Sequence, residues 1–145
     1  MQARTWFPVQ AIVLIFASLA CSSPSDQGDW TRVVGLIDTA GAELDPLIVP
    51  DTIRAGVAFI ATVTTFGNTG CIRPDRSQVR ASGLQADITP YDSARSGLPP
   101  CLAGWEAYSR SVDLVFATPG AARVRLHGRG FTGDLTLEKA ISVQP

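Results

Sequence analysis

The sequence has very little histidine and cysteine, and it lacks the short motifs of several enzyme classes. His127 is the only histidine, and there are three cysteines among 145 residues. Protein zinc sites usually take four ligands from Cys, His, Asp and Glu, so this composition argues against a zinc centre. The GxSxG nucleophile elbow, the acidic calcium loop and the glycine-rich phosphate loop are all absent. We therefore predict no metal, no cofactor, no catalytic residues and no enzyme activity.

The chain also lacks an excess of positive charge. It has 12 Lys and Arg residues against 13 Asp and Glu residues, and its formal net charge is −1. Proteins that bind nucleic acids need a basic patch to attract phosphates, so this balance gives no reason to expect a nucleic-acid partner. The hydrophobic content of 46% and the charged content of 17% are ordinary for a folded domain.

No apolar run is long enough to be a stable transmembrane helix. The longest, AIVLIFASLA at residues 11–20, is about half of the ~20 residues that a spanning helix needs. It follows the positive charge of Arg4 and ends in the small residues Ser18 and Ala20. This order is typical of a secretory signal peptide, which we predict for residues 1–20.

Two interpretations of the cleavage site remain open. An ordinary signal peptidase could accept the small residues before Cys21. Alternatively, SLAC at residues 18–21 resembles the lipobox of bacterial lipoproteins, although Ser18 stands where leucine is commonest. That resemblance implies a lipidated Cys21, carrying two or three acyl chains such as palmitate, as the first mature residue. One chain alone would bind a membrane only marginally. Ser22, in place of the aspartate that retains enterobacterial lipoproteins in the inner membrane, implies delivery to the outer membrane of the bacterial cell envelope.

The cysteine count favours the lipoprotein interpretation. Cys71 and Cys101 are the only other cysteines, so they can form one disulfide if Cys21 is acylated. Otherwise an exported protein would carry a free thiol near its N-terminus. Residues 21–29 are small and polar, which suits a flexible tether between the lipid and the domain. The lipid anchor would then make the membrane a partner of the protein.

From residue 30 onward the sequence has the alternation of β-strands. Residues 56–66, 111–117 and 122–130 alternate most clearly, and no amphipathic helix of three turns is found. Further strands are predicted at residues 31–38, 45–50, 77–82, 84–91 and 135–144. The last strand loses its alternation near Lys139, which indicates a bulge or a sheet edge. Seven to eight short strands predict an all-β, antiparallel sandwich or barrel over residues 30–145, and we favour the sandwich.

Most of the mature chain also resembles a known group of proteins. The lipobox, VPDTIRAGVAFIATVTTFG at residues 49–67, Cys71 and VDLVFATPGAARVRLHGRG at residues 112–130 resemble small bacterial lipoproteins with an immunoglobulin-like domain. The resemblance implies an immunoglobulin-like sandwich with an adhesion, assembly or scaffold role, and an envelope protein or glycan as partner. It carries no active site with it.

One predicted strand face carries a candidate binding surface. Four side chains share one face of the strand at residues 122–130: Arg123, Arg125, His127 and Arg129. The more common explanation is a solvated face, in which Glu138 or Asp113 on neighbouring strands pairs with these cations. The alternative is an anion-binding module, in which several guanidinium groups bind a phosphate or carboxylate.

A second candidate surface surrounds the longest segment predicted to be irregular, residues 90–108. Trp105, Tyr108 and Tyr91 lie in or beside it. Packing under the segment is the more common role for such aromatic residues. Alternatively they form a contact surface for a protein or a sugar, because Tyr and Trp are enriched at binding hot spots. An envelope enzyme or protease inhibitor acting through this segment is a further alternative function.

Overall fold

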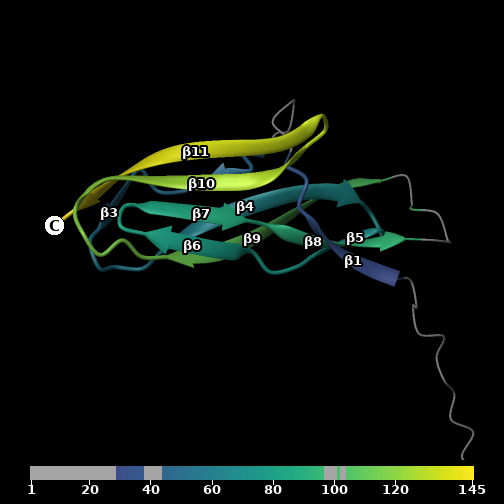
Figure 1. Ribbon diagram of the computed structural model, residues 1–145, viewed down its shortest axis with the longest axis horizontal. Helices are drawn as coiled ribbons and strands as arrows, with labels where there is room; N and C mark the ends of the chain where they lie inside the picture. Colours follow the sequence, from purple (N-terminus) through teal and green to yellow (C-terminus); the bar gives the residue numbers. More distant parts are fainter. Residues whose placement is uncertain (1–28, 38–43, 97–100, 102–103) are drawn as a thin grey trace, which may run out of the picture.

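The computed structural model describes residues 29–37, 44–96, 101 and 104–145, so the predicted signal peptide and Cys21 lie outside the described residues (Figure 1). The described chain is all-β, as predicted. Its strands are β1 (Asp29–Val34), β2 (Leu47–Ile48), β3 (Thr52–Arg54), β4 (Phe59–Asn68), β5 (Ile72–Pro74), β6 (Gln78–Ser82), β7 (Gln85–Thr89), β8 (Tyr91–Ser96), β9 (Trp105–Leu114), β10 (Gly120–Gly130) and β11 (Gly133–Gln144).

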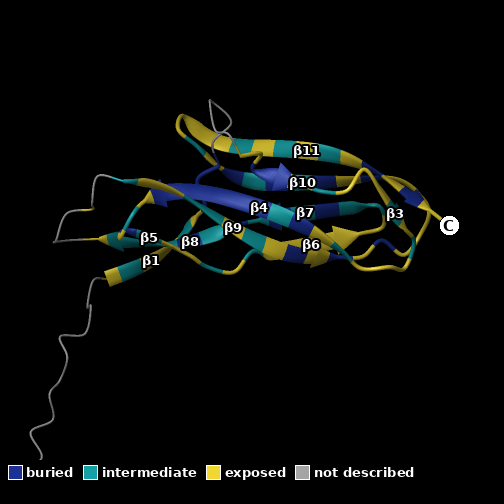
Figure 2. Cartoon of the chain, turned by 180° about the vertical axis from the view of Figure 1, so that it is seen from behind, coloured by how far each residue is buried: buried dark blue, intermediate teal, exposed yellow. Residues whose placement is uncertain are grey.

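Two sheets pack against each other around one hydrophobic core. The larger sheet has the order β3-β11-β10-β7-β6, and the smaller has the order β2-β4-β9. Strands of both sheets contribute alternate side chains to the space between them, although β6 at the edge of the larger sheet is exposed throughout. The buried positions of β4, β7 and β10 are visible in Figure 2. The buried core residues are Ile37, Leu47, Ala61, Val63, Ala86, Ile88, Val112, Leu114, Phe116, Ala122, Val124, Leu126, Ile141 and Val143. The predicted β-sandwich is therefore confirmed.

The pairing of the strands is mixed, not strictly antiparallel as predicted. β7 runs parallel to β10, and β3 runs parallel to the end of β11. Leu36 forms an antiparallel bridge to Phe66 of β4 and a parallel bridge to Arg129 of β10. This short stretch therefore connects the two sheets along one edge. Neither parallel pairing produces an alternation that differs from that of an antiparallel pair, so the sequence pattern could not reveal them.

A third sheet, also of three strands, extends one end of the sandwich. It has the order β1-β8-β5. The strand predicted at residues 84–91 is divided at Pro90, because proline cannot donate a ladder hydrogen bond. As a result, β7 belongs to the five-stranded sheet and β8 to this third sheet. The prediction of one irregular segment over residues 90–108 was wrong, because β8 and the first part of β9 fall within it. Residues 97–100 and 102–103 lie outside the described chain.

The C-terminal strand has no bulge. Its pairing with β10 runs without interruption from Gly120 opposite Val143 to Gly130 opposite Gly133. The edge interpretation fits better, because among the described strands β3 covers β11 only at residues 142–144. Lys139 pairs with Asp45 there at 2.7 Å. A charge at this position protects an edge strand from pairing with another chain.

Gly67 of β4 is buried directly beneath Ile72. A Cβ atom added at Gly67 would lie 2.5 Å from Cγ1 and 2.7 Å from Cβ of Ile72. We expect Gly67→Ala to lower the free energy of unfolding by about 1–3 kcal/mol, the usual cost of overpacking. Urea unfolding followed by circular dichroism would measure it. The double variant Gly67→Ala/Ile72→Ala should cost less than the sum of the two single changes. Strict additivity would contradict the predicted clash.

Candidate functional site

The predicted disulfide between Cys71 and Cys101 is present, and it closes one end of the sandwich. The two Cα atoms are 5.4 Å apart, and the bridge spans a sequence separation of 30 residues. Backbone hydrogen bonds hold the same region: the amide of Thr69 donates to the carbonyl of Gly104, and that of Cys71 donates to Asn68. The bridge therefore joins the turn after β4 to the segment that leads into β9.

A small cleft lies beside this disulfide. Its volume is about 230 Å³, and its walls include Leu36, Phe66, the disulfide, Trp105 and Arg129. Trp105 is 52% exposed, and its ring stacks on that of Phe131, with the centroids 6.0 Å apart. Phe131 lies in the two-residue turn between β10 and β11 and is 67% exposed. We call Trp105 and Phe131 the aromatic tip.

The three aromatic residues predicted to cluster do not form one surface. Trp105 and Tyr108 are an odd number of residues apart on β9, so their side chains lie on opposite faces. Tyr108 is half-buried and donates to Glu106 at 3.3 Å; burial first, and then the charge of Glu106, raises its pKa. Tyr91 is covered by the guanidinium of Arg32, 3.9 Å from the ring centroid. Only Trp105 is exposed, and its actual neighbour, Phe131, was missed.

The strand face of β10 points outward as predicted, but a carboxylate occupies its centre. Asp87 of the neighbouring strand β7 accepts from Arg125 Nε at 2.7 Å and lies 2.7 Å from His127 Nε2. Arg123 pairs with Glu138 at 3.3 Å, as the solvated-face interpretation expected. The expected pairing with Asp113 was wrong, because Asp113 lies on β9 in the other sheet.

Arg129 is separated from the other three side chains of this face. It lines the cleft beside Trp105. A more polar cavity of about 320 Å³ lies instead next to the Asp87 centre, and its walls are Gln78, Arg80, Asp87, Thr89, Tyr91 and His127. Hydrogen-bond donors, acceptors and one aromatic ring therefore converge on a single concavity, which we call the Asp87 cavity. This arrangement can hold a ligand that carries hydroxyl, amide or acidic groups.

His127 lies between an acid and a hydroxyl group. Its Nδ1 is 3.1 Å from Thr136 Oγ1, and its Nε2 faces Asp87. The order of acid, imidazole and hydroxyl is that of acyl-transfer triads, in which the acid stabilises the imidazolium. Here Arg125 donates to the same Oδ1 atom of Asp87 and already compensates its charge. Thr136 also lies exposed on an open strand. The contacts are therefore those of a cross-strand polar network.

Asp87 should make the stability of the domain depend on acid pH. Hydrogen bonds from Arg125 and then from His127 hold the pKa of Asp87 well below its ordinary value of 3.8. A carboxyl with a lowered folded-state pKa stabilises the fold above the unfolded pKa, and this contribution is lost as the pH falls toward the folded pKa. We expect Asp87→Asn to be less stable than the wild type near neutral pH, and to lose less stability on acidification below about pH 4.

Urea midpoints measured across this pH range would test the prediction. Asp113→Asn is the matched control, because it removes an exposed carboxylate from the other sheet. Parallel curves for the wild type and Asp87→Asn would contradict the assignment.

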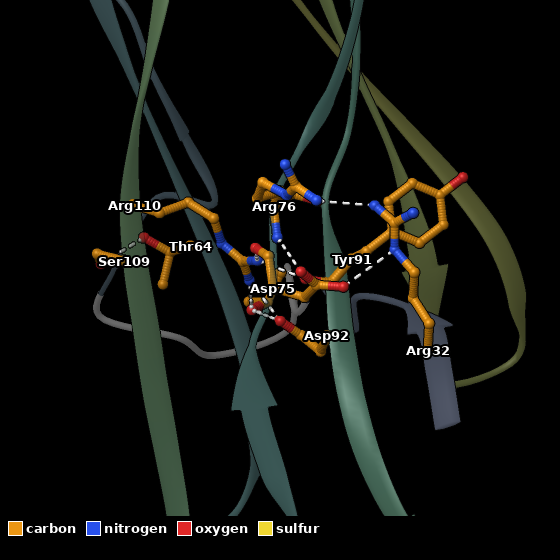
Figure 3. A network of polar contacts seen from close by, with 9 residues as sticks. Arg32, Thr64, Asp75, Arg76, Tyr91, Asp92, Ser109 and Arg110 are labelled. Carbon is orange, nitrogen blue, oxygen red and sulfur yellow. Dashed lines mark hydrogen bonds and ion pairs between the residues drawn. The ribbon is translucent and has the colours of Figure 1, made fainter. Parts of the chain in front are cut away.

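A buried ionic network lies where the sheets divide (Figure 3). Arg110 of β9 donates to Asp92 Oδ1 at 2.5 Å and also to the hydroxyl of Thr65. It donates in addition to the carbonyls of Asp75 and Tyr91, which flank the breaks between β5 and β6 and between β7 and β8. Asp92 is only 1% exposed. The network satisfies backbone groups that a continuous ladder would otherwise pair.

Sequence reasoning missed this network because the predicted strand began at residue 111. Arg110 occupies a position that alternates inward together with Val112 and Leu114. An arginine in register with an apolar stripe is the signal that could have indicated a buried acidic partner.

Comparison of the sequence and the fold with known proteins identifies no relative. No family model, curated protein or solved structure matches the chain. Within the described part of the chain, no three or more His, Cys, Asp and Glu side chains gather in a way that could hold a metal ion. The same residues contain no helix of the length and apolarity needed to cross a membrane.

Proposed function

We propose that this protein is a lipid-anchored, non-enzymatic module of the bacterial cell envelope that binds or scaffolds an envelope component. The observation that carries the proposal is the disulfide between Cys71 and Cys101. Because that bridge uses two of the three cysteines, Cys21 is the one that remains for acylation. The lipobox-like SLAC sequence and the polar stretch that follows it support the same assignment. A compact β-sandwich is consistent with an immunoglobulin-like scaffold.

The Asp87 cavity is our proposed ligand site. Its polar lining includes the carboxamide of Gln78 and the hydroxyl of Thr89, beside the ring of Tyr91. Such a lining suits a hydroxyl-rich ligand, so we propose an envelope glycan. Binding to immobilised envelope glycans should fall about tenfold in Asp87→Asn, in line with the loss of one hydrogen bond to a charged group. Asp113→Asn should bind as the wild type does. Equal binding by all three proteins would contradict this site.

The anion-binding alternative predicts an effect of the opposite sign at the same residue. Arg80 and His127 line the Asp87 cavity. Asp87 acts as the internal counter-ion of Arg125, with which it forms an ion pair. If the natural ligand is a phosphate or carboxylate, Asp87→Asn should free the guanidinium and strengthen binding. Calorimetric titration with inorganic phosphate at low salt would measure this. Stronger binding by the variant would favour the anion module over the glycan module.

The anchor is tested by the intact mass of the membrane-extracted protein. We expect the mass of residues 21–145 plus two or three acyl chains, with two further thiols that react only after reduction. A Cys21→Ser variant should carry no lipid. An unlipidated wild-type protein with a reactive thiol would overturn the anchor and leave a secreted protein.

A further inference from the structure

We infer that the aromatic tip, Trp105 and Phe131, inserts into the headgroup region of the membrane to which Cys21 is anchored. The inference rests on the proposed lipid anchor. Trp105 is about half exposed and Phe131 is two-thirds exposed, although the two rings stack on each other. The other large hydrophobic side chains exposed in the described chain are aliphatic. Among the described residues, this end of the sandwich therefore presents an aromatic surface that remains exposed.

The aromatic tip lies at the end of the sandwich from which the tether departs. Trp105 is paired with Asn68 at the end of β4, and Asp29, the first described residue, is paired with Ser96 at the end of β8. Figure 1 shows the start of β1, the start of β9 and the β10–β11 turn at one end, with the C-terminus at the other. A lipid at Cys21 would thus attach the domain by its aromatic end.

The tether is too short to hold this end far from the lipid. Only seven residues, 22–28, lie between Cys21 and Asp29, so eight Cα-to-Cα steps connect the two. Even fully extended, they span only about 25–30 Å. The lipid anchor would therefore keep the aromatic tip close to the bilayer surface. A second contact that is weak by itself can then form, because the first attachment already holds the two surfaces together.

The chemistry of the tip fits the membrane interface. Trp is enriched at headgroup level, because its ring is apolar and its indole N–H can stay hydrated. Arg129 lines the cleft next to Trp105, so a guanidinium is available for lipid phosphate oxygens. In this orientation the polar Asp87 cavity lies on the flank of the sandwich, accessible to a ligand.

Quenching of Trp105 fluorescence in vesicles tests the inference. The lipidated protein would be reconstituted into vesicles of phosphatidylethanolamine and phosphatidylglycerol, with and without lipids brominated near the headgroup. In Trp30→Phe, Trp105 is the only tryptophan of residues 21–145. We expect bromolipids to reduce its emission about twofold, and Phe131→Ser to diminish that quenching. Val57→Ser, an exposed apolar residue next to β3, is the control and should leave quenching unchanged.

The outcomes separate the tip from the anchor. Protein that floats with vesicles and shows lipid quenching of Trp105 supports both. Protein that floats without quenching overturns the inference and leaves the anchor intact, whereas protein that does not float overturns the anchor. If Trp30→Phe does not fold, the difference in quenching between the wild type and Trp105→Phe gives the same information.

Discussion

Arg110→Met is expected to lower the free energy of unfolding by about 3–5 kcal/mol, because it leaves the carboxylate of Asp92 buried without its partner. Asp92 is almost fully buried, and Arg110 is its ion-pair partner at 2.5 Å. The variant would also remove the donor shared by the carbonyls of Asp75 and Tyr91. Methionine keeps an unbranched apolar chain about as long as the methylene stem of arginine, so the change removes mainly the guanidinium and not the packing of the stem. Urea unfolding at neutral pH would measure the change.

A second variant separates two contributions to the free energy of unfolding: the penalty of an unpaired buried charge and the net stabilisation by the ionic network. In Arg110→Met/Asp92→Leu both charges are gone, and replacement of a buried pair by apolar residues is often nearly neutral. We expect this double variant to recover much of the lost stability. Exposed Arg123→Met, whose partner Glu138 is also on the surface, should cost about 0–1 kcal/mol. An equal cost for Arg110→Met and Arg123→Met would contradict the role assigned to the buried network.

The strands could be predicted from the sequence where one face of the strand is buried and the other is exposed to solvent. β10 shows this most clearly, because Val124 and Leu126 enter the core while Arg125 and His127 point outward. Period-two alternation reports burial, so it located β10 closely. It does not report the neighbour of a strand. The parallel pairing of β10 with β7 depends on the chain path between them, and the short β3 and β5 are too brief to establish a period.

Only the part of the candidate site that lies on one face of a single strand, β10, could be predicted from the sequence. Arg123, Arg125 and His127 were correctly grouped, because a strand places alternate residues on one side. Asp87 lies 38 residues before Arg125, so their contact follows from the sheet order and not from local sequence. Phe131 was missed for a related reason. A lone aromatic residue in a turn shows neither a period nor a motif, and its stacking on Trp105 requires the disulfide end to be assembled.

Loss of the disulfide is expected to lower the free energy of unfolding by about 3–4 kcal/mol, from the chain-entropy cost of a loop of some 30 residues. Such a change is a large part of the ~5–15 kcal/mol that stabilises a typical domain. The measurement is urea unfolding of Cys71→Ala/Cys101→Ala against the oxidised protein. Both would carry Cys21→Ser, so that no third thiol can exchange with the bridge.

The effect of the bridge should also be local, because it joins two connecting segments at one end of the sandwich and crosses no part of the core. Once the bridge is absent, the cleft beside Trp105 loses one wall. We therefore expect the emission of Trp105 to shift toward that of exposed tryptophan at urea concentrations where the β-sheet signal is still native. Addition of reductant to the oxidised protein should reproduce the behaviour of the double variant. If Trp105 emission and the β-sheet signal change together at an unaltered midpoint, the bridge does not stabilise this end, and the aromatic tip must be held by the β10–β11 turn alone.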